Sequence, residues 1–472
     1  MNELPVVVVG AGPAGLAAAA HLLERGLEPL VLEAGPGAGS AVSQWSHVRL
    51  FSPWAELVDP ASERLLTGTG WSRPAGDSYP SGGEWVASYL APLAATLGER
   101  VRFGARVVGV ARRGRDRLVD AGRESEPLTV HVRTADGEER VTARALIDAS
   151  GTWGTPNPLG GDGLPAIGEA AAADRISHRV PDAGSPDDAA RYGGRHVVVA
   201  GSGHSALTAL ITLTELAERS PGTRVTWLLR RGSVGDAFGG GADDQLPARG
   251  ALGQRGRRAV EAGHVRVVNG FRTAEVRRAG DGRLTLVSDT GIEVTGVDEV
   301  VALTGFRPDL SWLSEVRLRL DPVLEAPEAL APLIDPNVHS CGTVPPHGVA
   351  ELAHPEPGVF LVGMKSYGRA PTFLTLTGFE QVRSVVAKLA GDDAAAARVE
   401  LTLPETGVCG GAGLFDDADG SDGAAGAAGG CCVPDATAVS DEVTHPPAAA
   451  RIVPLLGSIT SGSITSGPVL SN

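Results

Sequence analysis

The most regular hydrophobic pattern lies at the start of the chain. Val6–Val9 is an unbroken apolar run, which predicts a buried strand of a parallel sheet. An alanine- and leucine-rich stretch with helical spacing follows, and residues 30–32 form a second apolar run that ends at Glu33. This pattern predicts a strand, a helix and a second, parallel strand.

The turn between the first strand and the helix is rich in glycine, with the sequence Gly10-Ala11-Gly12-Pro13-Ala14-Gly15. The first glycine permits a sharp turn, the second lets the backbone approach a pyrophosphate, and the third lets the helix pack closely on the strand. Free N–H groups at the helix N-terminus favour phosphates, and Glu33 is placed to accept hydrogen bonds from a ribose. The unit predicts a dinucleotide site; the alternative is a glycine-rich turn in an unrelated α/β protein.

A near copy of this unit opens the second half of the chain. An apolar strand at residues 195–200 leads into Gly201-Ser202-Gly203-His204-Ser205-Ala206, a helix predicted over residues 207–219 and a strand over 225–229. Arg230 and Arg231 follow this last strand, where the first unit has an acid. A cationic pair at that position suits a 2′-phosphate and predicts NADPH, whereas the alternative is two solvent-exposed arginines.

Further apolar runs predict the remaining strands and helices. Two strands end in similar turns, Ser150-Gly151 and Thr304-Gly305, and a helix after Pro371 is expected to hold that proline in its first turn. The predicted strands cover residues 101–110, 128–132, 145–149, 265–268, 284–288, 299–303 and 359–362, and the predicted helices cover residues 85–97 and 373–389.

An aromatic stretch follows the first unit, between Gln44 and Trp54. It contains Trp45, Phe51 and Arg49 in a chain of only 4% aromatic residues. It predicts a wall around an aromatic ring system, with Arg49 or Gln44 supplying polar contacts. The alternative is a small hydrophobic cluster under a loop.

Composition limits the classes of protein that the chain represents. The chain has 472 residues, enough for two or three domains, and a formal charge of −15 that argues against nucleic-acid and anionic-membrane partners. No apolar run reaches the roughly 20 residues of a membrane helix. The apolar N-terminus lacks a basic start, so we do not interpret it as a signal peptide. Four cysteines in so long a chain do not form a secreted disulfide framework, and we expect a cytoplasmic protein.

The last part of the chain has a different composition. From residue 396 onward it carries nine acids and two arginines, and glycine, alanine and aspartate dominate residues 410–430. Such sequence is expected to be flexible. Cys409, Cys431 and Cys432 lie here. They form a candidate thiolate site for a trivalent metalloid or soft metal; the alternative is that these cysteines occur by chance.

Two dinucleotide units on one chain resemble the flavin-dependent monooxygenase superfamily and the related disulfide reductases, over roughly residues 5–391. The resemblance implies that the first unit binds FAD and the second NADPH, and Trp45 stands where the monooxygenases carry a tryptophan. The implied FAD contacts are Gly10, Gly12, Pro13, Ala14, Gly15, Glu33, Ala34, Trp45, Val107, Ser150, Gly151 and Gly363. The implied NADP contacts are Gly201, Ser202, Gly203, His204, Ser205, Arg230, Arg231, Thr304 and Gly305. Gln44, Trp45, Arg49, Ser52, Arg369 and Thr372 are the candidates near the flavin, and no general acid or base stands out.

The chain departs from both branches of this group. The phenylalanine-x-glycine fingerprint followed by histidine, which the Baeyer–Villiger and N-oxygenating branches carry, is absent, and His178 is the nearest histidine. The folded region holds Cys341 alone, so no cysteine pair serves as a dithiol relay. More narrowly, the aromatic stretch, the second glycine turn and residues 363–372 resemble flavoproteins of actinobacterial arsenic-resistance clusters.

These features predict an α/β chain with two Rossmann-like domains. We expect an FAD domain at residues 1–160, an NADPH domain at 161–298, the return of the FAD domain at 299–395 and a flexible tail at 396–472. The expected activity is that of an FAD- and NADPH-dependent monooxygenase with a small-molecule substrate and molecular oxygen, in metalloid resistance. The alternatives are a reductase of related fold and a metalloid-binding scavenger, and a homo-oligomer stays open.

Overall fold

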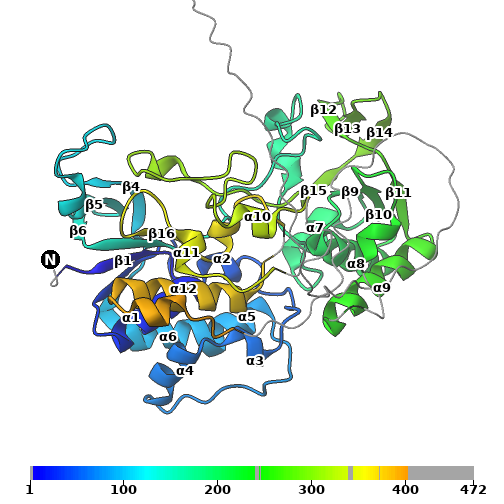
Figure 1. The fold of residues 1–472 in the computed structure, drawn as a ribbon. Helices are drawn as coiled ribbons and strands as arrows, with labels where there is room; N and C mark the ends of the chain where they lie inside the picture. Colours follow the sequence, from blue (N-terminus) through cyan, green and yellow to red (C-terminus); the bar gives the residue numbers. More distant parts are fainter. Residues whose placement is uncertain (1–3, 240–243, 245, 338–343, 372, 402–472) are drawn as a thin grey trace, which may run out of the picture. The chain divides into compact units, whose positions relative to one another are not determined.

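The computed structural model describes residues 4–239, 244, 246–337, 344–371 and 373–401. Two five-stranded parallel sheets and two three-stranded antiparallel sheets organise these described residues (Figure 1). The expected α/β class with two Rossmann-like units is confirmed. The thiolate candidates Cys409, Cys431 and Cys432, and also Cys341 and Thr372, lie outside the described residues.

The first parallel sheet has the strand order β16-β7-β1-β2-β3. All four valines of its central strand are buried, because Val6 and Val8 pack against a helical cluster and Val7 and Val9 pack against a second cluster on the other face. Val9 at the end of this strand pairs with Leu32 on one side and Asp148 on the other, so the three chain segments end side by side. The strands are β1 (Val6–Val9), β2 (Pro29–Leu32), β3 (Val101–Arg102), β7 (Ala145–Asp148) and β16 (Val359–Leu361).

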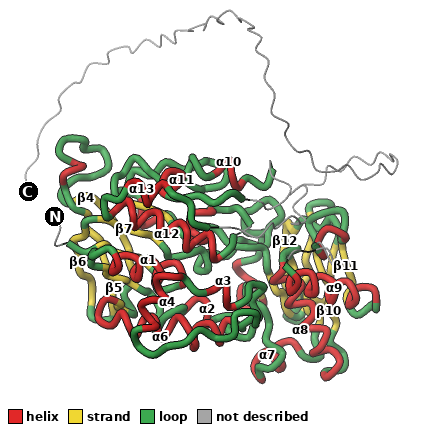
Figure 2. Tube along the Cα trace, turned by 60° about the horizontal axis from the view of Figure 1, so that its bottom comes forward, coloured by secondary structure: helices red, strands yellow, loops and turns green. Residues whose placement is uncertain are grey.

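The helices of the first unit pack on one another around this sheet. The alanine-rich α1 contacts α12, α4 and α6, and its small side chains allow the close approach (Figures 1 and 2). The helices are α1 (Pro13–Glu24), α2 (Ser40–Ser43), α3 (Trp54–Leu57), α4 (Pro60–Thr67), α5 (Gly82–Trp85), α6 (Ala91–Leu97), α10 (Ala331–Ile334), α11 (Val349–Leu352), α12 (Thr375–Leu389) and α13 (Asp393–Ala397).

The second parallel sheet has the order β11-β10-β9-β15-β8 and repeats the arrangement of the first. Helices α8 and α9 pack against each other beside β10 and β11 (Figure 2). The elements are β8 (Ile176–Ser177), α7 (Pro186–Tyr192), β9 (His196–Ala200), α8 (His204–Arg219), β10 (Arg224–Leu228), α9 (Pro247–Glu261), β11 (Val265–Val268) and β15 (Glu299–Ala302). Because β15 pairs with β9, this sheet extends past the expected domain boundary at residue 298.

Two antiparallel sheets complete the described fold. One contains β4 (Arg106–Arg112), β5 (Leu128–Thr134) and β6 (Gly137–Ala143), and the other contains β12 (Thr273–Arg278), β13 (Leu284–Ser288) and β14 (Glu293–Val297). The single strand expected at residues 101–110 is two strands, β3 and β4, in different sheets. None of the described helices is both long and apolar enough to cross a membrane.

Two predicted helices differ from the structure in an instructive way. The helix expected over residues 85–97 is interrupted by a π-helical turn, Val86–Leu90. Pro92 has no N–H to donate to Ser88, and the Ser88 carbonyl accepts a bond from Trp71 Nε1 at 2.7 Å instead. Helix α12 begins at Thr375 because Leu374 is extended, so Pro371 does not lie in its first turn, contrary to the expectation.

Candidate functional site

The first glycine turn joins β1 to α1 through tight backbone packing. Gly10 has φ +99°, and a Cβ at this position would lie 2.8 Å from the Ala149 carbonyl oxygen. A Cβ on Gly15 would lie 1.9 Å from the Gly10 carbonyl oxygen. Gly12 differs, because a Cβ there would meet nothing within 4 Å. Two glycines are therefore needed for the turn itself, and the third leaves open space beside it.

This open space faces the N-terminus of α1. Gly12 is the N-cap residue, and no side chain caps the helix. Pro13 occupies the first turn, where its missing N–H removes no helical hydrogen bond. The uncapped N–H groups and the dipole of this twelve-residue helix suit a phosphate. The turn therefore fits the diphosphate of a dinucleotide.

The carboxylate of Glu33 accepts hydrogen bonds from two backbone N–H groups of the protein. Its Oε2 accepts a hydrogen bond from the backbone N–H of Ala11 at 2.8 Å, and its Oε1 accepts one from Gly35 at 2.7 Å. The carboxylate thus ties the glycine turn to the loop after β2, a role that the sequence did not predict. Each oxygen keeps a second lone pair, so the structure remains compatible with the expected ribose contact.

Two later segments lie against the first turn. A Cβ on Gly10 would lie 3.0 Å from Ser150 Cα, and a Cβ on Gly363 would lie 3.1 Å from Ala14 Cβ. The Gly363 N–H donates to Gln381 Oε1 at 2.7 Å, so this amide already has an acceptor. The structure thus places Ser150 and Gly363 beside the first turn, and the contacts of Ser150, Gly151 and Gly363 with FAD stay predictions.

For the other residues predicted to contact FAD, the structure shows their burial or packing but no contact with the first turn. Ala34 is exposed, and Val107 is buried in the core beside β5, so its side chain packs within the protein. Trp45 packs against Gly82, where a Cβ would lie 2.7 Å from the indole Cε3. Ser52 is half-buried. These positions stay predictions.

The polar candidates near the flavin have partners in the protein. Gln44 Oε1 accepts a hydrogen bond from Arg179 Nη2 at 2.8 Å. The Arg49 guanidinium bonds the Tyr79 carbonyl and lies 3.7 Å from Glu84 Oε2, and Arg369 Nε pairs with Glu325 at 2.7 Å. A role for either arginine at a ligand would require it to exchange a carboxylate partner.

The second glycine turn repeats the geometry of the first. Gly201 has φ +125°, and a Cβ there would lie 2.2 Å from the Leu303 carbonyl oxygen, whereas a Cβ on Gly203 would meet nothing within 4 Å. Ala206 is fully buried against the strand. Helix α8 begins at His204, three residues before the expected start, so its uncapped N-terminus adjoins the open space. This turn also fits a diphosphate.

His204 is the first residue of α8. The ring of Phe51 contacts its imidazole edge to face, with 5.0 Å between centroids. Desolvation, followed by the positive charge of Arg249, lowers the pKa of His204. Its ring is therefore neutral at pH 7 and adds no charge to the turn. Ser205 beside it is exposed.

Arg230 and Arg231 follow the buried Leu229 at the end of β10. Arg230 Nη1 donates to the Gly161 carbonyl at 3.5 Å. Desolvation and the neighbouring charge of Arg231 both lower the pKa of Arg230, so the two guanidiniums act on each other as a cationic pair. The pair follows the second turn's own parallel strand, as the sequence predicted.

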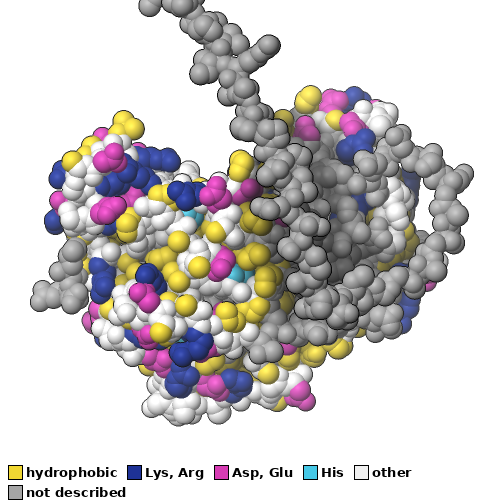
Figure 3. All heavy atoms as spheres, in the orientation of Figure 1, with side chains coloured by type: hydrophobic (Ala, Val, Ile, Leu, Met, Phe, Trp, Pro, Cys, Tyr) yellow, Lys and Arg dark blue, Asp and Glu magenta, His cyan; other side chains and the backbone are white. Residues whose placement is uncertain are grey.

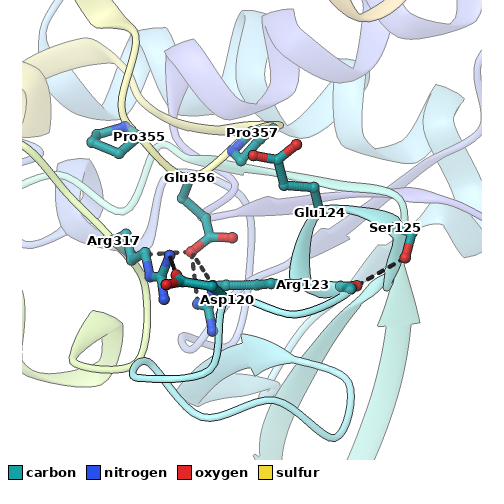
Figure 4. A pocket seen from close by; sticks show the side chains of 9 residues that line it. Asp120, Arg123, Glu124, Ser125, Arg317, Pro355, Glu356 and Pro357 are labelled. Carbon is teal, nitrogen blue, oxygen red and sulfur yellow. Dashed lines mark hydrogen bonds and ion pairs between the residues drawn. The ribbon is translucent and has the colours of Figure 1, made fainter.

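Charged residues elsewhere mostly pair with one another. On the face shown in Figure 3, basic and acidic side chains are interspersed rather than separated by sign. A pocket of about 490 Å³ is lined by residues that belong to neither glycine turn. Within it, the Arg317 guanidinium pairs with the Asp120 carboxylate at 2.6 Å. The pocket is lined by Asp120, Gly122, Arg123, Glu124, Ser125, Arg317, Pro355, Glu356 and Pro357 (Figure 4). Among the described residues, no cluster of histidine, cysteine, aspartate or glutamate suits a metal ion.

Comparisons with known proteins agree with this geometry. Residues 7–341, which span both turns, match the family described as "Pyridine nucleotide-disulphide oxidoreductase". A ferredoxin–NADP reductase of Salinispora tropica is 30% identical over 68% of this chain and 80% of its own. The indole-3-pyruvate monooxygenase YUCCA1 of rice (Oryza sativa subsp. japonica) is 38% identical over 151 residues, 32% of each chain.

A solved structure shares the fold. The bacillithiol disulfide reductase Bdr of Bacillus cereus superposes with a TM-score of 0.61 at 21% identity, covering 82% of this chain and 99% of its own. Together these matches indicate a flavoprotein oxidoreductase that uses FAD and a nicotinamide cofactor. An arsenic-specific relationship does not emerge from them and stays a prediction.

Proposed function

The chain belongs to the pyridine nucleotide-disulphide oxidoreductase family, and on that premise we propose that it transfers hydride from NADPH to a resident FAD. The observation that carries the proposal is the pair of matching turns. Each has open space at its second glycine, Gly12 or Gly203, and each follows a buried parallel strand. Glu33 follows the first unit, and Arg230 and Arg231 follow the second. We assign FAD to the first turn and NADPH to the second.

Different residues of the two turns bind different parts of the cofactors. The N-termini of α1 and α8 hold the diphosphates, and the arginine pair selects a 2′-phosphate. When bound, FAD supplies the two-electron chemistry. The aromatic stretch around Trp45 excludes water from the ring system. The neutral ring of His204 leaves the entrance of the second turn free of additional charge.

For the electron acceptor, we propose molecular oxygen and a small soft nucleophile. In the net reaction, NADPH, a proton, O2 and the substrate give NADP+, water and the oxygenated substrate. The resemblance to flavin monooxygenases and the local identity with YUCCA1 support this assignment. Trivalent arsenic is the member of this substrate class that the narrower resemblance suggests.

The ferredoxin–NADP reductase relative favours a second candidate, because its identity extends over most of both chains. In that case the two electrons pass to a separate redox protein or small acceptor, and oxygen is not incorporated. The reductase candidate shares both cofactor sites with the first and differs only in the acceptor.

One experiment separates the candidates. The purified protein is reduced with NADPH under argon, and NADPH consumption is then followed in argon and in 18O2, with arsenite or a thioether as substrate. A monooxygenase consumes NADPH with oxygen and places one labelled atom in the product. Turnover under argon with a one-electron acceptor, and no label in any product, would support the reductase instead. If NADPH does not reduce the bound flavin at all, the hydride-transfer proposal is wrong.

A further inference from the structure

The chain contains only two lysines, Lys365 and Lys388, among its 41 basic residues. Lys388 lies on the surface and pairs with Asp393. Lys365 is 1% exposed and lies in the 3₁₀ turn Gly363–Tyr367, directly after β16. Burying an ammonium group costs free energy unless its partners are well placed, so this lysine has a specific environment.

The ammonium group of Lys365 lies near three oxygens, from residues 148–150 and from Asp309. Its Nζ lies 2.9 Å from Ser150 Oγ, 2.7 Å from the Asp309 carbonyl oxygen and 3.1 Å from Asp148 Oδ2. The ammonium donates hydrogen bonds to the first two of these oxygens, and its contact with Asp148 Oδ2 is an ion pair. A planar guanidinium donates in one plane, whereas the compact ammonium reaches acceptors that converge on a point.

The same cluster fixes Ser150 at two atoms. The backbone N–H of Ser150 donates to Asp148 Oδ1 at 3.0 Å, while its hydroxyl oxygen accepts from Lys365. Because that oxygen accepts from a cation, its own proton is directed elsewhere. None of the described residues accepts this proton, and Ser150 is exposed. The serine also adjoins the first glycine turn, as the short distance from Gly10 shows.

We propose that Lys365 and Asp148 position Ser150 so that its hydroxyl donates a hydrogen bond to FAD bound at the first turn. This inference rests on the proposed placement of FAD. Ser150 makes the contact, and Lys365 is a positioning residue that acts through it. A hydroxyl that accepts a bond from a cation is also a stronger donor, since chains of hydrogen bonds polarise one another.

The test measures FAD affinity rather than turnover. Deflavinated protein is titrated with FAD, the dissociation constant is read from flavin fluorescence, and thermal unfolding of each apo variant is recorded. Lys365→Met alone would leave Asp148 buried without a counter-charge and is expected to fold poorly. Lys365→Met is therefore combined with Asp148→Asn, which removes both charges together. Lys388→Met is the matched control and is expected to bind FAD as the unaltered protein does.

We expect Ser150→Ala to weaken FAD binding about tenfold, the size of a lost hydrogen bond to a charged or polarised group. Ser150→Thr keeps the hydroxyl and is expected to retain affinity. The Asp148→Asn/Lys365→Met variant is expected to bind FAD more weakly by a similar factor. Adding Ser150→Ala to it should not weaken FAD binding further. Such non-additivity distinguishes positioning through Ser150 from a separate effect of the charges.

Three results would overturn the inference: unchanged FAD affinity in Ser150→Ala, additive losses in the triple variant, or lowered melting temperatures with unchanged affinity. Gly12→Val in the same titration tests the placement of FAD independently. If Gly12→Val abolishes binding while Ser150→Ala does not, the FAD site stands and the role of Ser150 is wrong. If Gly12→Val binds FAD normally, the site itself is misplaced.

Discussion

At the scale of single residues, the buried carboxylate of Glu356 joins distant parts of the chain. Its oxygens accept hydrogen bonds at 2.7 Å from Arg112 Nε and from Arg123 Nη2. Burial raises the pKa of Glu356, but the hydrogen bonds from Arg123 and Arg112 outweigh it, and the pKa lies below its ordinary value of 4.5. Its stabilising effect is therefore complete above pH 4.5 and is lost as the pH falls through the lower pKa of the folded state.

Glu356→Gln is expected to lower the free energy of unfolding by about 3–5 kcal/mol at pH 7, because two buried guanidiniums lose their counter-charge. Urea unfolding at pH 7 and at pH 4 measures this, and the difference from the unaltered protein should shrink at the lower pH. Glu124→Gln is the control, because Glu124 is exposed at the same pocket. Equal stability of the two variants at pH 7 would show that the buried ion pairs do not stabilise the fold.

Individual residues also show how far sequence reasoning reaches. The steric need of Gly15 follows from the motif, because a Cβ there would meet the carbonyl of Gly10, five residues earlier, whereas the contact that excludes a Cβ at Gly10 comes from Ala149 on another strand. The partners of Glu33 and Lys365 do not follow from the sequence either, since they depend on segments that meet only in the folded protein. A signal for Lys365 was nevertheless present, because lysine is rare in this chain.

At the scale of elements, we expect the same substitution, glycine to valine, to remove FAD binding in the first strand–turn–helix unit and NADPH binding in the second. A Cβ added at Gly12 or Gly203 meets no protein atom within 4 Å, and neither glycine has positive φ, so we expect both valine variants to fold. The new side chain would occupy the space assigned to a diphosphate. Gly12→Val is expected to purify without FAD, weakening its binding at least about 100-fold, or roughly 2.7 kcal/mol. Gly203→Val should keep its flavin and lose NADPH affinity by a similar factor.

Flavin absorbance and stopped-flow reduction by NADPH measure the two effects separately. Gly280→Val provides the control, since Gly280 also has open space around it but lies in the turn between β12 and β13. Loss of both cofactors in all three variants would point to general misfolding. If Gly12→Val and Gly203→Val both still bind FAD and NADPH, the two glycine turns are not the cofactor-binding sites.

Which elements the sequence reveals depends on how fully they are buried. The largely buried strand β13 coincides with the predicted residues 284–288, and β11, whose valines form an apolar pattern, coincides with residues 265–268. The strand β14 was missed, because its exposed positions carry polar residues that break the apolar run. The π-helical turn at Val86–Leu90 was also missed, since the Ser88 carbonyl that Pro92 leaves without a helical donor finds its partner in Trp71, outside the helix.

At the scale of the whole molecule, the chain passes between its two parallel sheets twice, and the two crossings bond to each other. Asn157 on the first crossing donates from Nδ2 to the Thr304 carbonyl at 3.0 Å, and its Oδ1 accepts from Arg307 Nε at 2.8 Å. The rings of Trp153 and Phe306 stack beside them at 4.9 Å. The sequence predicted both strand-end turns, but their pairing arises only from tertiary structure.

Asn157→Ala removes the side-chain bonds to both partners while leaving the backbone bond from Asn157 N–H to Gly305. We expect the free energy of unfolding to fall by about 1–3 kcal/mol and proteolysis to accelerate at the crossings, because Arg307 and the Thr304 carbonyl lose a partner. Asn157→Asp should lose less, since it keeps an acceptor for Arg307. Asn337→Ala, at an exposed turn held by Asp335, is the control. Because the altered bonds join the crossings and not the glycine turns, flavin content should stay unchanged. Loss of FAD without faster cleavage would mean that Asn157 acts on the cofactor site instead of on the connection between the sheets.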